Sequence, residues 1–229
     1  MKLISFNFKM LDEPVAIKGL TSFVIQDSQL FANFVQNLYQ YSEESENLKI
    51  FDKNYKSLKN ADLIIITDIL GHDVNNPSVL TQIYQDLEIQ ISIEPENKTQ
   101  IEQLLGEIVT LINKEILDFE IDLESEQLNL TGLLKAMKIK IEIQTDTIFE
   151  RVLEIVQVFK YLTKKRLLVL VNIGTYLSKR EIESLEEYVE LHNTPVLTVD
   201  RYPFAGLKKQ VILDEDFVIL TSNSNEKMV

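Results

Sequence analysis

The sequence predicts an α/β protein whose sheet-forming part is interrupted by a helical insertion. Short β-prone runs occur towards both ends of the chain, and amphipathic helical stretches separate several of them. Residues 78–117, in contrast, contain only helical periodicity. With 229 residues, of which 45% are hydrophobic, the chain is long enough to bury a substantial core.

The first part of the α/β domain is expected over residues 1–68. The helical spacing of Leu30, Phe34 and Leu38 predicts one helix, and Asp27 or Ser28 is the expected N-cap. The last β-prone run is apolar on both faces, as is typical of a buried parallel strand. The β-prone runs of this part are residues 3–8, 23–26, 48–51 and 62–67.

The helical insertion is expected over residues 69–140. Apolar residues recur at helical spacing over residues 78–117, and Pro95 divides them into two stretches. Two such helices are typical of a hairpin that packs on itself or on a partner subunit. Asp73 or Asn75 is the expected N-cap of the first one, and a shorter helix is expected over residues 130–135.

The second part of the α/β domain is expected over residues 141–229. One helix is predicted over residues 146–163, and Ser178 opens another, with Glu181 completing a capping-box pattern. The β-prone runs that return the chain to the sheet are residues 138–143, 167–171, 196–199, 210–213 and 217–220.

The composition excludes several classes of protein. No cysteine is present, which excludes disulfide scaffolds and thiolate zinc sites, and two histidines are too few for a multi-histidine metal centre. His72 stands between acids and could be a general base, but a turn is the simpler interpretation, and His192 is expected at a helix end. No apolar run approaches the roughly 18 residues of a membrane span. We therefore expect a soluble, cytoplasmic protein.

The glycines argue against a nucleotide site. A phosphate loop needs closely spaced glycines and a lysine, so that backbone amides and one ammonium group can surround the phosphates. After the β-prone run at residues 23–26 the chain instead offers Asp27 and Ser28. The glycines stand singly, at positions 19, 71, 106, 132, 174 and 206. ATP hydrolysis is therefore not expected.

One acidic segment has the residue types of a metal site. Between residues 118 and 126 an acid occupies every second position. Clustered carboxylates without histidine or cysteine suit a hard cation, and a flexible acidic loop suits calcium. A solvated acidic edge is the alternative interpretation. The acids are Asp118, Glu120, Asp122, Glu124 and Glu126.

Positive charge is gathered in three stretches. A net charge of −13 is unfavourable for nucleic-acid binding, and a solvated face is the ordinary interpretation of such stretches. If they share one face, however, they could hold a phosphate backbone. The stretches are Lys53, Lys56 and Lys59; Lys135, Lys138 and Lys140; and Lys160, Lys164, Lys165 and Arg166.

Several short stretches, spread over nearly the whole chain, carry a family resemblance. The most specific is Phe-Lys-Tyr-Leu-Thr-Lys-Lys at residues 159–165. The others are Leu-Asp-Glu-Pro at 11–14, Phe-Asp-Lys at 51–53, Ile-Ile-Ile-Thr-Asp-Ile-Leu-Gly at 64–71, Asp-Thr-Ile-Phe-Glu at 146–150 and Ile-Leu-Asp-Glu-Asp at 212–216. In this order they resemble the Csn-two family of type II-A CRISPR-associated adaptation proteins.

The resemblance implies a split α/β head similar to a degenerate P-loop ATPase, with an inserted α-helical leg, assembled as a ring-shaped homotetramer. It implies non-catalytic, sequence-independent binding of double-stranded DNA, especially linear ends, and structural calcium. The implied partners are the CRISPR integrase proteins and the RNA-guided nuclease of spacer acquisition. Glu120, Asp122 and Glu124 become the first candidate calcium ligands. Lysines 135, 138 and 140 become the first candidates for DNA contact, ahead of those at 53, 56, 59, 164 and 165.

Two functions of other classes stay open on the sequence. The first is a divalent-metal nuclease that holds two metal ions in the acidic segment. The second is a protein-interaction scaffold whose helical hairpin recruits partners and whose lysines bind no DNA directly.

Overall fold

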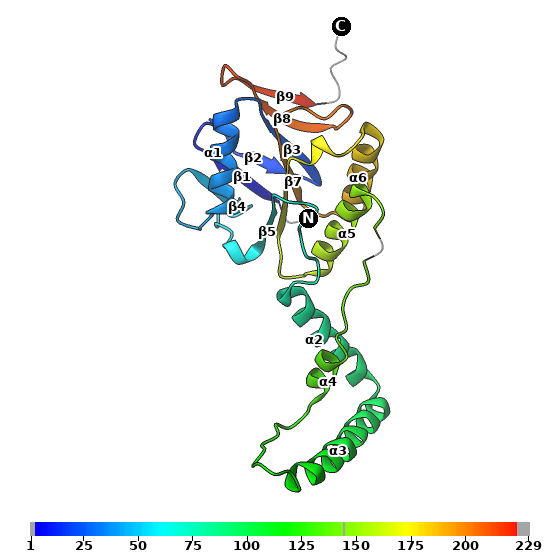
Figure 1. Cartoon of the computed structure of the whole chain (residues 1–229). Helices are drawn as coiled ribbons and strands as arrows, with labels where there is room; N and C mark the ends of the chain where they lie inside the picture. The colour runs from blue at the N-terminus through cyan, green and yellow to red at the C-terminus, as the bar shows by residue number, and fades with distance from the viewer. Residues whose placement is uncertain (1–2, 144, 224–229) are drawn as a thin grey trace. The chain divides into compact units, whose positions relative to one another are not determined.

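The computed structural model describes residues 3–143 and 145–223 and confirms the predicted α/β class with a helical insertion. The chain divides into two compact units (Figure 1). Unit 1 comprises Met1–His72 and Gln144–Val229, and unit 2 comprises Asp73–Ile143. Among the described residues, no helix is both long and apolar enough to cross a membrane.

Unit 1 contains two sheets. In the part of the chain that the structure describes, the smaller sheet is antiparallel and has the order β2 (Val15–Ile17), β1 (Ile4–Phe8), β4 (Leu48–Asp52). The larger sheet is parallel except for its last strand. Its order is β5 (Leu63–Ile66), β6 (Leu167–Val171), β7 (Val196–Asp200), β3 (Leu20–Ile25), β8 (Lys209–Leu213), β9 (Ile219–Asn223).

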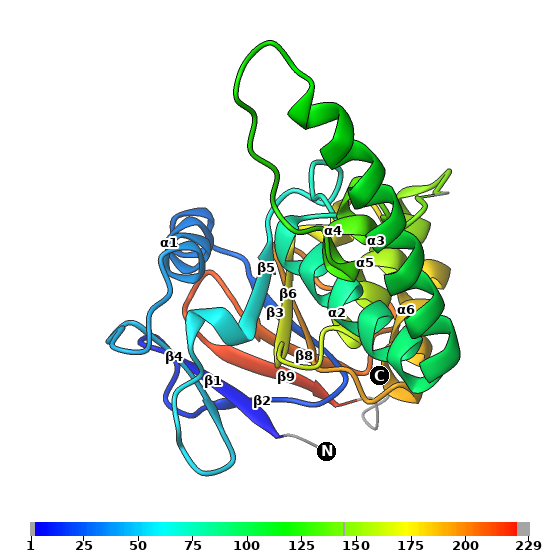
Figure 2. The ribbon, with the colours of Figure 1, turned by 90° about the horizontal axis from the view of Figure 1, so that it is seen from below.

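Three helices cover the larger sheet on its two faces. Helix α1 (Ser28–Tyr39) lies on the side of the small sheet, whereas α5 (Ile148–Tyr161) and α6 (Lys179–Leu191) lie on the other (Figure 2). Two short 3₁₀ turns adjoin strands of this sheet: η1 (Asn60–Asp62) directly precedes β5, and η2 (Ile173–Thr175) follows β6. The predicted caps of these helices are confirmed. Asp27 Oδ1 accepts the Leu30 amide at 2.7 Å, and Ser178 and Glu181 form a complete capping box.

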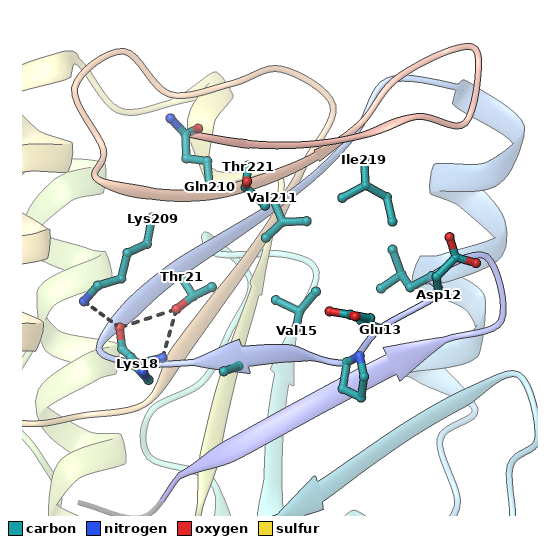
Figure 3. Close-up of a pocket in the computed structure, with 13 residues that line it drawn as sticks. Asp12, Glu13, Val15, Lys18, Thr21, Lys209, Gln210, Val211, Ile219 and Thr221 are labelled. Atoms are coloured by element: carbon teal, nitrogen blue, oxygen red, sulfur yellow. Dashed lines mark hydrogen bonds between the residues drawn. The ribbon is translucent and has the colours of Figure 1, made fainter. Parts of the chain in front are cut away.

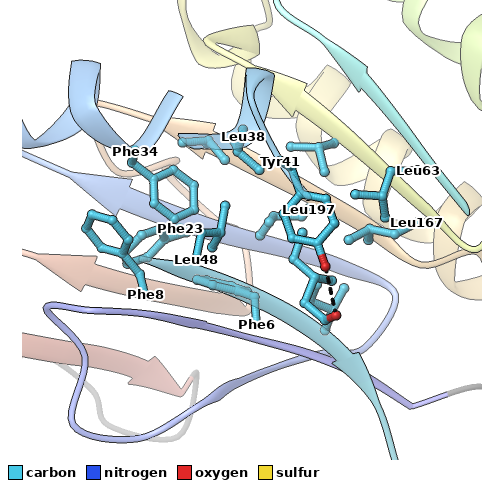
Figure 4. Close-up of a cluster of buried hydrophobic side chains, with 14 of the residues drawn as sticks. Phe6, Phe8, Phe23, Phe34, Leu38, Tyr41, Leu48, Leu63, Leu167 and Leu197 are labelled. Carbon is cyan, nitrogen blue, oxygen red and sulfur yellow. Dashed lines mark hydrogen bonds between the residues drawn. The ribbon is translucent and has the colours of Figure 1, made fainter. Parts of the chain in front are cut away.

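The main core of unit 1 lies between the two sheets and beneath α1 (Figure 4). Phe6, Phe8, Phe23 and Phe34 are fully buried there, with neighbouring ring centroids 5.0–5.9 Å apart. Most of these ring pairs meet edge to face, which is a favourable geometry for aromatic quadrupoles. The core therefore fixes β1 and β4 against the parallel sheet.

Unit 2 is built from α2 (Pro77–Ile93), α3 (Pro95–Leu117) and α4 (Leu130–Ala136). Pro95 separates the two long helices, as predicted. A small core forms around Tyr84, Leu130 and Leu134. Only Leu105 of α3 is buried, so much of the apolar surface of α3 faces solvent.

Several local predictions differ from the structure. Asn76 caps α2, rather than Asp73 or Asn75. Strand β2 was not predicted, and β9 begins two residues later than expected. Residues 138–143 form no strand. Their backbone instead bonds to side chains on and before α2: Tyr84 donates to the Ile139 carbonyl at 3.0 Å, and Asn75 pairs with both backbone groups of Ile141.

Candidate nucleic-acid interface

The first lysine stretch forms a tight loop after β4. Phe51 pairs with Ser57 across this loop, and the Asp52 carboxylate accepts the amides of Asn54 at 2.9 Å and Lys56 at 3.2 Å. These backbone hydrogen bonds, with the nearby Arg166, hold the pKa of Asp52 below its usual value. The loop is therefore ordered by a carboxylate that stays ionised at neutral pH.

The third basic stretch contacts this loop, although it lies more than 100 residues further along the chain. Arg166 lies 3.3 Å from Asp52 Oδ2, and its backbone amide donates to the Asp62 carbonyl at 2.7 Å. Lys165 Nζ donates to the carbonyls of Ala61 at 2.7 Å and Leu63 at 3.2 Å. We call the resulting surface the basic patch; it consists of Lys53, Lys56, Lys59, Lys164, Lys165 and Arg166.

The cations of the basic patch are not equivalent. Lys53, Lys56, Lys59 and Lys164 are exposed, and within the described residues none of them has a carboxylate partner within 4.0 Å. Partial burial lowers the pKa of Lys165, whose ammonium group is already used by two carbonyls. The four exposed lysines are thus available to a ligand, while Lys165 and Arg166 hold the two stretches together.

The second lysine stretch lies in unit 2. Lys135 is in the last turn of α4, and Lys138 and Lys140 follow it; all three are exposed. Lys138 has a φ of 53°, and its amide donates to the Lys135 carbonyl, which ends the helix. The predicted DNA-binding lysines are therefore divided between the two units.

The acidic segment connects α3 to α4 as an exposed, irregular chain. Asp118 is the C-cap of α3, and all five acids are exposed. Among the described residues, no three acidic or histidine side chains lie close enough together to hold a metal ion. A single chain in this conformation does not fit a preformed calcium site.

The turn between β3 and α1 occupies the strand–turn–helix position at which P-loop proteins bind phosphate. Here the Asp27 side chain accepts the Leu30 amide at the start of α1, and Arg201 donates to the Gln26 carbonyl at 2.7 Å. A carboxylate at this position would repel a phosphate group. The structure thus agrees with the absence of a phosphate-loop sequence.

A groove of about 640 Å³ lies elsewhere in unit 1, between β2 and the β8–β9 pair (Figure 3). Val15, Val211 and Ile219 line its middle, with Lys18 and Lys209 towards one end and acidic side chains towards the other. Lys209 Nζ is engaged by the Lys18 carbonyl and by Glu190. No residue of the basic patch lines this groove.

Among the described residues, neither histidine belongs to a group of three side chains that could hold a metal ion. The carbonyl of His72 accepts a hydrogen bond from Arg151. His192 is the C-cap of α6, as predicted, and its Nδ1 lies 3.1 Å from Lys160 Nζ.

Together these features define an α/β protein with a helical insertion, an exposed cationic patch and no phosphate loop at the β3–α1 turn. A family model described as CRISPR-associated protein (Cas_Csn2) matches residues 40–217. The chain belongs to this family of CRISPR-associated proteins.

Two curated relatives agree with this assignment, and one solved structure has a similar fold. The chain is 46% identical over 213 residues to "CRISPR-associated protein Csn2" of Enterococcus faecalis, covering 93% of this chain and 96% of that protein. It is 42% identical over 221 residues to the protein of the same name from Streptococcus agalactiae, covering 96% and 99%. The fold is similar to the crystal structure of Stu0660 of Streptococcus thermophilus, with a TM-score of 0.51 at 16% identity, covering 97% of this chain and 76% of that one.

Proposed function

We propose that the protein binds double-stranded DNA, especially linear ends, without sequence preference and without cleaving it, during spacer acquisition in CRISPR immunity. The observation that carries this proposal is the basic patch, where two lysine stretches distant in sequence form one surface. Exposed lysines without carboxylate partners can neutralise phosphates, which gives affinity without base recognition. Membership of a CRISPR-associated family supports the biological setting.

Assembly into a homotetrameric ring would reconcile DNA binding with a net charge of −13. Four copies of a few lysines around one hole concentrate positive potential there, while the acidic surface faces outward. The exposed apolar face of α3 supports self-association, because Leu104, Ile108 and Leu111 are each about half or more exposed. The lysines at 135, 138 and 140 are further candidates for the rim of the ring.

Calcium remains part of the proposal as a structural ion. Since one chain does not gather three ligands, the acidic segment would have to rearrange or receive ligands from another subunit. Glu120, Asp122 and Glu124 are the first residues to test, followed by Asp118 and Glu126. The proposed partners besides DNA are the CRISPR integrase proteins and the RNA-guided nuclease, in the cytoplasm.

The decisive experiment measures binding of an open linear duplex, and of the same duplex blocked at both ends by bulky groups, at several salt concentrations. Preference for the open duplex, with an affinity that falls steeply with salt, is expected from a ring that threads onto an end. Lys53→Glu and Lys56→Glu should weaken binding, whereas Lys9→Glu, which reverses an exposed lysine outside the basic patch, should do so much less.

Three results would contradict the proposal. Equal binding of open and blocked duplexes would exclude threading. Cleavage of DNA in magnesium or manganese would favour the nuclease. Undiminished binding after charge reversal in the basic patch and at positions 135, 138 and 140 would favour the scaffold. Mass measurement with calcium and with a chelator tests the tetramer and its ion separately.

A further inference from the structure

Tyr55 lies in the loop that carries Lys53 and Lys56 of the basic patch, and its backbone conformation is unusual. Its side chain is 82% exposed, and its φ of 60° lies in the left-handed region. Bulky residues rarely adopt this region, and in a short hairpin loop glycine or asparagine usually takes such a position. An exposed aromatic side chain at a strained backbone position is a candidate for function.

The loop holds Tyr55 in place before any ligand arrives. The Tyr55 amide donates to the Asp52 carbonyl at 2.8 Å, while the Asp52 carboxylate accepts the amides on either side of it. Arg166 anchors that carboxylate from the neighbouring segment. Little conformational entropy is therefore left to be lost when Tyr55 contacts a ligand.

The ring of Tyr55 already belongs to a stack. It lies 5.5 Å from the ring of Phe51 at an interplanar angle of 22°. With 82% of the residue exposed, the ring retains a large open surface beyond this contact. Lys53 and Lys56 flank it in sequence, and Lys59 follows. Aromatic rings beside cations form the usual binding surface for unstacked nucleobases.

We propose that Tyr55 stacks on the terminal base pair of a DNA duplex, while the lysines of its loop hold the adjacent phosphates. The proposal rests on the DNA binding proposed above and adds a reason for preferring ends. Base pairs inside a duplex have both faces covered by neighbours, whereas a terminal pair has one face free. Lysine contacts alone do not distinguish an end from the interior.

A single-tryptophan variant tests the contact directly. The chain has no tryptophan, so Tyr55→Trp places the sole indole at the proposed site. A blunt linear duplex should quench its fluorescence, whereas a closed circular duplex of the same sequence should not. Tyr39→Trp is a matched control, because Tyr39 on α1 is 79% exposed and lies outside the basic patch; its fluorescence should not respond to either duplex.

Affinity measurements separate stacking from charge. Tyr55→Ala should weaken binding of the linear duplex by about 5- to 100-fold. It should leave the salt dependence unchanged, since no charge is removed, whereas Lys53→Ala should reduce the slope by about 0.9. Tyr55→Phe should bind like the wild type. Circular dichroism and thermal melting of each variant establish that it is folded.

Two sets of results would overturn the inference. If the wild type binds linear DNA but Tyr55→Ala binds equally well, or if linear and circular duplexes quench Tyr55→Trp equally, end stacking is wrong while the proposed function stands. If the wild type binds neither duplex, the proposed function fails and the stacking contact fails with it.

Discussion

Replacing Asp200 with asparagine should stabilise the protein increasingly as the pH rises. Asp200 ends β7 with only 2% of its surface exposed, and this burial raises the pKa of its carboxyl to about 7 despite a hydrogen bond from the Gly174 amide at 2.8 Å. Among the described residues its Oδ2 has no hydrogen-bond partner. The folded protein thus holds a proton that the unfolded chain releases near its ordinary pKa of 3.8.

The sign of the effect follows from proton linkage. Between the two pKa values the folded state binds more protons than the unfolded state, so stability is lost as the pH rises towards 7. The loss is about 1.4 kcal/mol per pH unit well between the two pKa values and smaller near pH 7, which gives roughly 2 kcal/mol between about pH 5 and about pH 7. Asparagine keeps the acceptor for Gly174 and carries no charge. Its stability relative to aspartate should therefore grow by roughly 2 kcal/mol over this range.

Urea unfolding of wild type and Asp200→Asn at about pH 5, 6, 7 and 8 measures this difference directly. Any constant penalty for an unpaired amide, about 1–3 kcal/mol, shifts all points equally and leaves the trend intact. Asp12→Asn removes an exposed carboxylate and controls for the loss of one negative charge. A free-energy difference between Asp200→Asn and wild type that stays flat with pH would refute the assignment of the proton to Asp200.

Three further substitutions test the fold by the same unfolding measurement. Lys165→Met should destabilise the protein by about 1–2 kcal/mol, because two backbone carbonyls lose their hydrogen-bond donor. Lys164→Met, the control, should change stability by less than about 0.5 kcal/mol. Equal effects of the two substitutions would contradict the distinction between these lysines. Phe34→Ala should cost about 3–5 kcal/mol, since its ring contacts three others in the core, and a loss below about 1 kcal/mol would contradict that packing. Ser178→Ala should cost about 1 kcal/mol through loss of the α6 cap, and an unchanged stability would show the cap to be dispensable.

Local signals made much of the fold predictable. Residues with helical or alternating spacing identified the long helices and most strands, and Asp27, Ser178 and Glu181 marked helix starts through hydrogen bonds to nearby amides. Residues 138–143 misled because alternating lysine and isoleucine satisfy a strand pattern. Their backbone is satisfied by side chains of unit 2, and such long-range partners leave no trace in local spacing.

The sequence predicted the basic residues of the candidate interface but not their arrangement in space. The three lysine stretches are visible in the sequence, but their division between the units and the joining of two stretches depend on tertiary contacts. The contact between Arg166 and Asp52 spans more than 100 residues. Tyr55 was missed as a candidate, although its position between lysines was a signal; its exposure and left-handed backbone are known only from the structure. The alternating acids between residues 118 and 126 are visible in the sequence, whereas the irregular, exposed path of that segment is known only from the structure.

The order of strands in the larger sheet has a consequence for synthesis of the chain. Strand β3 is made early, yet its neighbours in the sheet are β7 and β8, which begin at Val196 and Lys209. At about 5–20 residues per second, the ribosome adds the intervening residues in roughly 10–40 seconds. During that time the apolar strand Leu20–Ile25 has neither of its sheet partners. Until β7 and β8 emerge, the unpaired edges of β3 favour aggregation, which docking of α1 and the small sheet would reduce.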